Sequence, residues 1–431
     1  MSREELALFG GPKTIESWEG ELTRGVGELG QRPLPVGASQ EEIEAIVEAL
    51  KSGDFARYKP IYEFEKEFAS YMNVKYALAT NNGTSSILAA LFAIGVGPGD
   101  EVITPSYTWH LGVTPILALR AIPIFCEIDP KTLTADPEDI KRRITPRTKA
   151  IIVTHIWGVP ADMDPIMEIA QEHGIPVIED ASHAHGNEYK GRKVGTIGDI
   201  GCFSLQMSKA LPAGEGGVLI TNNEDYFERA VVISDYSRVI RDVKSGELKK
   251  YRWGGFGFKF RMHPLAAVLA KVWLRRLDHQ NEIRRRNHEY LYKRLLEVPG
   301  IEPQYIPPYA KMGAWYGFRA QYFAEQLNGV PKERFIEALR AEGVPVFPER
   351  YWLVHLIPAL REQKVFPKDC PFKCPYVECK VRYKEGDLPI TEAVYKRLIG
   401  FPTFQGKDYR YLIDKVMDAV WKVIRNIDVL E

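Results

Sequence analysis

Apolar residues recur with two spacings along the first two thirds of the chain. In 41–51 and 60–72 they fall three or four positions apart, which predicts two amphipathic helices. Short apolar runs bounded by turn residues predict strands, at 76–80, 101–105, 122–128, 150–154, 176–180, 200–206 and 218–220. Helical segments separate most of these runs. The alternation favours a mostly parallel sheet with helices on both faces, with ligand-binding residues at the carboxyl ends of the strands.

The pattern changes towards the C-terminus. A long charged helical segment, 264–297, is followed by shorter strands and helices typical of a smaller α+β domain. We therefore predict two domains: residues 1–290, which include an irregular N-terminal arm, and residues 291–431. Between them, the polar, aromatic and basic stretch 235–261 is predicted either to reach over a site or a neighbouring subunit, or to be a solvated loop.

Composition narrows the functional class. The 57 basic residues equal the 57 acidic ones, which argues against binding to nucleic acid or to an anionic membrane. No apolar run is long enough to cross a bilayer, and residues 1–5 lack a signal-peptide layout. With an odd number of cysteines as well, we expect a cytoplasmic protein. Cys370, Cys374 and Cys379 lie close in sequence, but free or structural thiols are favoured and no metal site is predicted.

A single lysine, Lys209, lies in the turn that follows the strand 200–206, ahead of the glycine-rich Gly214–Gly217. A partly buried lysine can form a Schiff base with an aldehyde. Ser204, just upstream, can offer a hydroxyl group to an anion. Most lysines in such loops are merely surface residues, so Lys209 becomes informative only together with other segments.

Three upstream segments supply complementary groups. Gly83, Thr84 and Ser85 follow a strand and begin a helix, where free backbone N–H groups can bind an anion, although such residues are also ordinary helix caps. Trp109 follows another strand and could stack on a planar ring or belong to the core. Asp180 ends a third strand with a carboxylate. An amine, a carboxylate, an anion site and a flat aromatic are the groups that pyridoxal 5′-phosphate requires.

The motifs that carry these residues resemble those of the DegT/DnrJ/StrS aminotransferases. The matching stretches are Asp180–Gly186, Phe203–Lys209 and Gly214–Gly217, and the resemblance runs in order from about residue 6 to 392. It implies a fold type I transferase, with a three-layer α/β/α large domain that binds pyridoxal 5′-phosphate and a smaller C-terminal α+β domain.

The resemblance also implies roles for individual residues. Lys209 would hold the cofactor covalently, Asp180 would face its ring nitrogen, and His183 would lie beside the ring. Trp109 would stack on the ring. The phosphate-binding positions are matched by Gly83, Thr84 and Ser204, and the neighbouring Ser85 is included as cofactor-binding.

One position departs from the family pattern. Lys259 stands where the family usually has an asparagine that the second subunit lends to the phosphate. It could bind the phosphate as a point charge or could instead face the substrate. The resemblance further implies a homodimer with shared active sites. Because Lys209 is a lysine rather than the histidine of the dehydratase branch, transamination is favoured over dehydration.

The reaction implied is transfer of an amino group from glutamate or glutamine to a keto-cyclitol of the scyllo-inosose type or to a keto-sugar. A nucleotide-keto-sugar acceptor is the alternative, and a non-catalytic regulatory protein on the same fold is another. A desulfurase would need a mobile cysteine near the cofactor. Cys126 and Cys202 are the candidates, but both fall in strands predicted to be buried.

Overall fold

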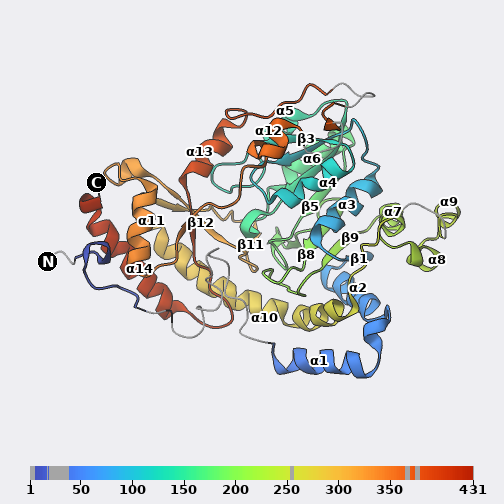
Figure 1. The fold of residues 1–431 in the computed structure, drawn as a ribbon, viewed down its shortest axis with the longest axis horizontal. Coiled ribbons are helices and arrows are strands. Elements are labelled where there is room, and N and C mark those ends of the chain that lie inside the picture. The colour runs from blue at the N-terminus through green and yellow to red at the C-terminus, as the bar shows by residue number, and fades with distance from the viewer. Residues whose placement is uncertain are drawn as a thin grey trace.

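The computed structural model describes residues 5–16, 18, 38–252, 257–364, 369–373 and 379–430. Figure 1 shows a larger and a smaller part, with the long helix α10 (Pro264–Leu295) running from one to the other. No helix within the described ranges combines the length and the apolar character needed to cross a bilayer.

A seven-stranded sheet lies at the centre of the larger part. The strands, in spatial order, are β1 (Tyr76–Thr80), β9 (Gly217–Thr221), β8 (Ile200–Ser204), β5 (Val177–Asp180), β4 (Thr148–Thr154), β2 (Glu101–Pro105) and β3 (Ile122–Cys126). The strands from β8 to β3 are parallel, and β9 is antiparallel to both its neighbours. All strands except β9 therefore point their carboxyl ends to the same edge, as the alternating sequence pattern predicts.

Helices cover both faces of this sheet. On one face pack α3 (Gly83–Ile94), α4 (Thr114–Ala118) and α7 (Glu224–Ser234). On the other face pack α2 (Lys59–Met72), α5 (Pro137–Arg143), α6 (Met163–His173) and the first half of α10. The strands are apolar on both sides because both of their faces are buried. The predicted fold class, a three-layer fold type I transferase with a mostly parallel sheet, is confirmed.

Helix α1 (Gln40–Lys51) lies against α10 at the outside of the larger part. It starts with a capping box, in which Ser39 and Glu42 bond to each other's backbone N–H. The Nε1 of Trp273, on α10, donates to the Glu42 carboxylate at 2.8 Å.

The smaller part is built on a four-stranded antiparallel sheet with helices on it. Its strands are β10 (Ile301–Pro303), β12 (Phe318–Tyr322), β14 (Leu398–Phe401) and β13 (Phe347–Pro348), in that order. Helices α11 (Lys332–Ala341) and α14 (Arg410–Arg425) supply many of the other residues in its core. A third, small sheet pairs β11 (Ala310–Lys311), β6 (Glu188–Tyr189) and β7 (Arg192–Lys193).

The two parts exchange segments. Leu6 and Ile15 of the N-terminal arm belong to the core of the smaller part. The arm is held by the buried Glu342, whose carboxylate accepts from Ala7 N at 2.8 Å and pairs with Lys422 at 3.0 Å. In the other direction, α12 (Pro358–Glu362) and the described residues around it pack on the larger part, with Val354, Leu360, Phe372 and Tyr383 in its core. The domain boundary at residue 290 lies inside α10 and stays a prediction.

Buried hydrogen bonds hold this late segment of the chain against the larger part. Ser106 follows β2, and its hydroxyl lies 2.6 Å from Nδ1 of His355. Nε2 of the same ring lies 3.1 Å from Glu392, on α13 (Pro389–Arg397). The contact between Ser106 and His355 joins the end of β2 to a segment 249 positions later in the chain.

The stretch 235–261 is more ordered than the sequence suggests. It contains two short helices, α8 (Val239–Asp242) and α9 (Gly246–Lys249), and residues 253–256 lie outside the described ranges. Arg238 is buried and forms two hydrogen bonds to Glu65 of α2, at 2.6 and 3.0 Å. The described part of 235–252 is therefore anchored on its own chain and is not the solvated loop that composition allowed.

Candidate active site

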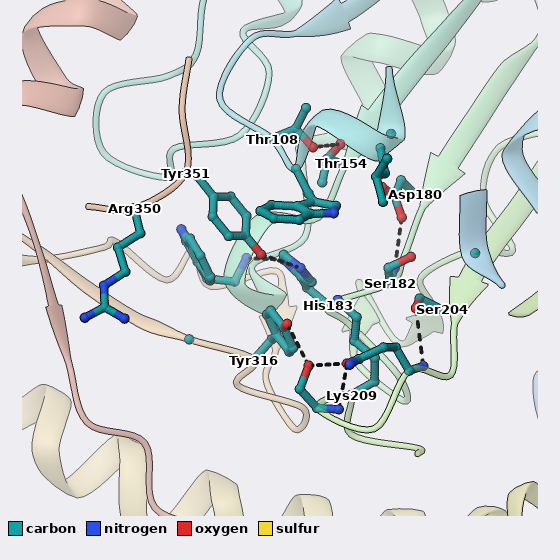
Figure 2. A pocket seen from close by; sticks show the side chains of 18 of the residues that line it. Thr108, Thr154, Asp180, Ser182, His183, Ser204, Lys209, Tyr316, Arg350 and Tyr351 are labelled. Atoms are coloured by element: carbon teal, nitrogen blue, oxygen red, sulfur yellow. Dashed lines mark hydrogen bonds between the residues drawn. The ribbon is translucent and has the colours of Figure 1, made fainter. Parts of the chain in front are cut away.

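A cavity of about 860 Å³ opens at the carboxyl edge of the large sheet, with walls from both parts. Such a volume is typical of small-molecule sites. Eight of the nine predicted site residues line it, namely Gly83, Thr84, Ser85, Trp109, Asp180, His183, Ser204 and Lys209. Figure 2 shows Asp180, His183, Ser204 and Lys209 around the same space, each from a different segment.

The first turn of α3 forms one end of the cavity. Asn82 caps the helix, since its Oδ1 accepts from Ser85 N at 2.8 Å and its carbonyl accepts from Ser86 N. The N–H groups of Gly83 and Thr84 have no partner of this kind among the described residues. A Cβ on Gly83 would lie only 2.8 Å from Cβ of Ser204, so the glycine brings the hydroxyl of Ser204 against the helix start. The two N–H groups, the hydroxyl and the helix dipole suit an anion.

Asp180 ends β5 and is nearly buried, with 6% of its surface exposed. The backbone N–H of Ser182 donates to its Oδ1 at 3.1 Å, which fixes the carboxylate as it lines the cavity. Directly before it, the fully buried Glu179 accepts N–H groups of Gly195, Ile197 and Gly198, each at 2.6 Å. These bonds hold the strand end from which Asp180 projects.

Lys209 lies in a tight turn, in which its backbone N–H donates to Gln206 O at 2.8 Å. Its Nζ is 3.9 Å from the ring centroid of Tyr316, a cation–π contact from the smaller part. The hydroxyl of Ser208 donates to the Gln206 side chain at 2.6 Å and lies 3.0 Å from the hydroxyl of Tyr316. The amine is thus placed in the cavity beside polar groups that can orient it.

His183 is enclosed by aromatic rings. Its ring stacks on Tyr316 with the centroids 3.9 Å apart and on Trp157 at 5.4 Å. The backbone N–H of Trp157 donates to its Nδ1 at 3.3 Å, so a neutral His183 carries its proton on Nε2. That atom lies 3.4 Å from the hydroxyl of Tyr351.

Trp109 lies at the cavity wall beside Tyr351, with the ring centroids 5.1 Å apart, and 44% of its surface is exposed. It is not a core residue, which was the other interpretation of its position in the sequence.

Lys259 is the ninth predicted residue, and the structure does not bring it into this cavity. It is exposed on the outside of its own chain. Its neighbours in sequence are nevertheless close to the anion site. The backbone N–H of Asn81 donates to Phe260 O at 2.6 Å, and Thr80 and Arg261 pair through an isolated antiparallel β-bridge. The segment therefore passes next to the start of α3, while the exposed Lys259 side chain does not line the cavity of its own chain.

Sequence reasoning missed the residues that the smaller part contributes, chiefly Tyr316, Arg319, Arg350 and Tyr351. Arg319 donates to Glu349 at 2.6 Å, and the hydroxyl of Tyr107 donates to the same carboxylate oxygen at 2.5 Å. Burial alone would raise the pKa of Glu349, but the charge and hydrogen bond of Arg319 lower it below its ordinary value. Aromatic and charged residues clustered at 313–319 and 347–351 were the available signal.

The cysteines lie away from this chemistry. Cys126 and Cys202 are fully buried, do not line the cavity, and burial raises the pKa of both thiols. Neither is a mobile nucleophile, which removes the support for desulfuration. Cys370 and Cys379 are free thiols, and Cys374 lies outside the described residues. Within the described ranges, no group of three His, Cys, Asp or Glu side chains is placed to hold a metal ion.

Known aminotransferases are similar to this chain in sequence and in fold. Over 394 residues the chain is 34% identical to an L-glutamine:2-deoxy-scyllo-inosose aminotransferase of Streptoalloteichus tenebrarius, covering 86% of this chain and 89% of that protein. It is 32% identical to the spore coat polysaccharide biosynthesis protein SpsC of Bacillus subtilis, covering 90% and 96%. The crystal structure of an aminotransferase from Psychrobacter cryohalolentis superposes with a TM-score of 0.79 at 28% identity, covering 92% and 100%.

The sequence profile of the DegT/DnrJ/EryC1/StrS aminotransferase family matches residues 37–420. With the cavity geometry and the relatives above, this match sets aside a non-catalytic scaffold. The chain belongs to the DegT/DnrJ/EryC1/StrS family and is an aminotransferase.

Proposed function

We propose that the chain binds pyridoxal 5′-phosphate in this cavity and transfers an amino group from L-glutamine or L-glutamate to a keto-cyclitol of the scyllo-inosose type. One observation carries the proposal: Lys209 and Asp180 line one cavity together with an anion site at the start of α3. The donor set fits the cofactor, because it supplies one amine, one carboxylate and unpaired N–H groups. When bound, the cofactor supplies an electron sink that makes the α-proton of an amino acid acidic.

Separate residues of the chain would hold the phosphate, face the ring nitrogen and attach the cofactor. The start of α3 and Ser204 would hold the phosphate. Asp180, fixed by Ser182 N–H, would keep the ring nitrogen protonated. Lys209 Nζ would hold the cofactor covalently and, when displaced, would move a proton at the substrate carbon.

The rings around the site would keep water out and fix orientation. His183 would lie beside the cofactor ring, and Trp109 would stack on that ring. Tyr351 remains a neutral donor, because burial raises the pKa of its hydroxyl well above the ordinary value. It can therefore offer a proton in a hydrogen bond without becoming an anion.

The acceptor class is supported by relatives. The aminotransferase of Streptoalloteichus tenebrarius is named for 2-deoxy-scyllo-inosose and L-glutamine, and its similarity covers most of both chains. A nucleotide-linked or other keto-sugar is the second candidate, favoured by the similarity to SpsC, a polysaccharide biosynthesis protein. We further propose a cytoplasmic homodimer, in which Lys259 of each subunit serves the site of the other.

Cofactor attachment can be tested by chemical trapping. The purified protein, mixed with pyridoxal 5′-phosphate and reduced with borohydride, is expected to carry the cofactor on Lys209, as found by peptide mapping. The Lys209→Ala variant should lose both the yellow colour and the label. Lys190→Ala removes an exposed lysine of the same domain and should keep both. A label on another lysine in the wild type would overturn the assignment.

The acceptor can be tested by single turnover. The protein is first converted with L-glutamine, freed of donor, and then mixed with scyllo-inosose or with a nucleotide-linked keto-sugar. Return of the yellow absorbance together with an aminocyclitol in the mass spectrum is the expected result. Return with the nucleotide-sugar alone would select the second candidate.

A further inference from the structure

Trp18, on the N-terminal arm, lines the cavity but has no role in the function proposed above. It is half-buried and packs against the core of the smaller part. Its Nε1 donates to Gly343 O at 2.6 Å, and its ring stacks on Phe404 with the centroids 6.5 Å apart. Because the only polar atom of the indole is already bonded, Trp18 offers the cavity a flat, apolar ring.

The arm is held in place on two consecutive residues of the smaller part. The backbone N–H of Ile15 donates to Glu342 O at 3.0 Å, next to the bond from Trp18 to Gly343. The buried Glu342 carboxylate also accepts from Thr14, at 3.1 Å from its N and 2.7 Å from its Oγ1. Gly343 has a φ of +93°, and a Cβ there would clash with Ile15 O, so a glycine lets the arm come this close. These contacts fix the position of Trp18 in the cavity wall.

The wall residues that lie close in sequence to the two contacts of Trp18, Gly343 and Phe404, are mainly apolar. They are Pro345, Phe347, Phe401 and Pro402, with the hydroxyl of Thr403 beside them. Phe347 and Phe401 come from the neighbouring strands β13 and β14. The groups that suit the cofactor, Lys209, Asp180 and the start of α3, come instead from the larger part. The cavity thus joins a polar cofactor site to an apolar wall.

We propose that Trp18 is the platform on which the ring of the keto-cyclitol acceptor stacks. This inference rests on the proposed function. In a ring of the scyllo configuration every hydroxyl group is equatorial, so its faces carry only axial C–H bonds and its polar groups lie at the rim. Such a face is apolar and packs on an aromatic ring, while polar groups of the cavity meet the rim. L-Glutamine has no ring to place there. Trp18 is thus a residue of acceptor specificity, distinct from the groups that would hold the cofactor.

The two half-reactions separate this role from a general structural one. For Trp18→Leu, the scyllo-inosose concentration that half-saturates the return of the amino-loaded enzyme should rise about 10-fold, while the rate at saturation stays the same. Conversion of the yellow holoenzyme by L-glutamine should be unchanged, which also shows that the variant is folded. Trp18→Phe keeps a smaller flat ring and should lie between Trp18→Leu and the wild type. Phe9→Ala removes an exposed ring of the same arm that does not line the cavity, and it is the matched control.

Binding can also be measured without turnover. scyllo-Inositol has the same equatorial hydroxyl groups but no ketone, so it can occupy the acceptor position and cannot take up an amino group. Calorimetric titration of the holoenzyme with scyllo-inositol should show an affinity about 10-fold lower for Trp18→Leu than for the wild type. The affinity of Phe9→Ala should equal that of the wild type.

Three results would overturn the inference: unchanged acceptor saturation in Trp18→Leu, an equal loss in both half-reactions, or a loss confined to nucleotide-linked keto-sugars. The last would place a nucleotide base on the indole instead of a cyclitol. Failure of the wild type to aminate any acceptor would instead contradict the proposed function, and the titration with scyllo-inositol would still report on the stacking of the ring.

Discussion

At the scale of single residues, buried side chains that do not line the cavity hold the site residues in position, and Glu179 is the main example. Glu179 is fully buried and is bonded by His155 Nε2 at 2.9 Å as well as by three backbone N–H groups. Burial alone would raise its pKa, but the hydrogen bonds from His155 and from the backbone N–H groups bring the pKa below the ordinary 4.5. The carboxylate therefore stabilises the fold in its charged form, next to Asp180.

Glu179→Gln should lower the free energy of unfolding at neutral pH by about 3 kcal/mol, because it leaves buried donors with a weaker acceptor. The folded-state pKa is depressed, so the contribution is complete above the ordinary value and is lost as the pH falls through the folded-state value. Urea unfolding at a series of pH values should show wild type and variant converging below about pH 4.5. A difference independent of pH would contradict this, and the exposed Glu172→Gln is the control.

At the scale of elements, the sequence was most informative where a strand and the following helix together form a binding site. The residues 76–86 were predicted as a strand, an anion site and a helix start, and the structure has β1, the Asn82 cap and α3 there. Buried strands and amphipathic helices are local patterns, so they can be predicted. The short helices in 239–249 could not be, since they depend on the pairing of Arg238 with Glu65, 173 positions away.

The close approach of Gly83 to Ser204 gives a prediction for this element. Gly83→Ala would place a methyl group 2.8 Å from Cβ of Ser204 and 3.0 Å from its Cα, so β8 and α3 must separate. Cofactor affinity, measured by fluorescence titration with pyridoxal 5′-phosphate, should fall about 10-fold or more as the anion site opens. Gly97→Ala, which meets open space, should keep the wild-type affinity; equal affinity in Gly83→Ala would contradict the packing argument.

At the scale of the whole molecule, the site is a product of two parts that exchange segments. The groups from β1, β5 and β8 could be predicted because parallel strands end at one edge. The local clusters of aromatic and charged residues mark Tyr316, Arg350 and Tyr351 as candidates at most, because a local pattern does not say that their segments fold back over that edge. Lys259 shows the same limit, since its sequence motif matches a shared site while its side chain lies outside the cavity of its own chain.

The shared site can be tested by mixing inactive variants. If Lys259 serves the neighbouring subunit, Lys209→Ala and Lys259→Ala should each be impaired, yet an equal mixture exchanged between subunits should regain roughly a quarter of wild-type activity, because one site in each hybrid dimer is intact. Sedimentation should give a dimer. No recovery from a mixture of proven hybrids would place Lys259 in the site of its own chain.

The N-terminal arm has a consequence for biosynthesis. Trp18 lines the cavity and donates from Nε1 to Gly343 O at 2.6 Å, and the arm before it is held by Glu342 and Lys422. A ribosome makes residues 7–18 hundreds of positions before it makes these anchors. The larger sheet can form while translation continues, but this wall of the cavity closes only once α14 has left the exit tunnel. A nascent chain can therefore be folded at its centre and still be unable to enclose a substrate.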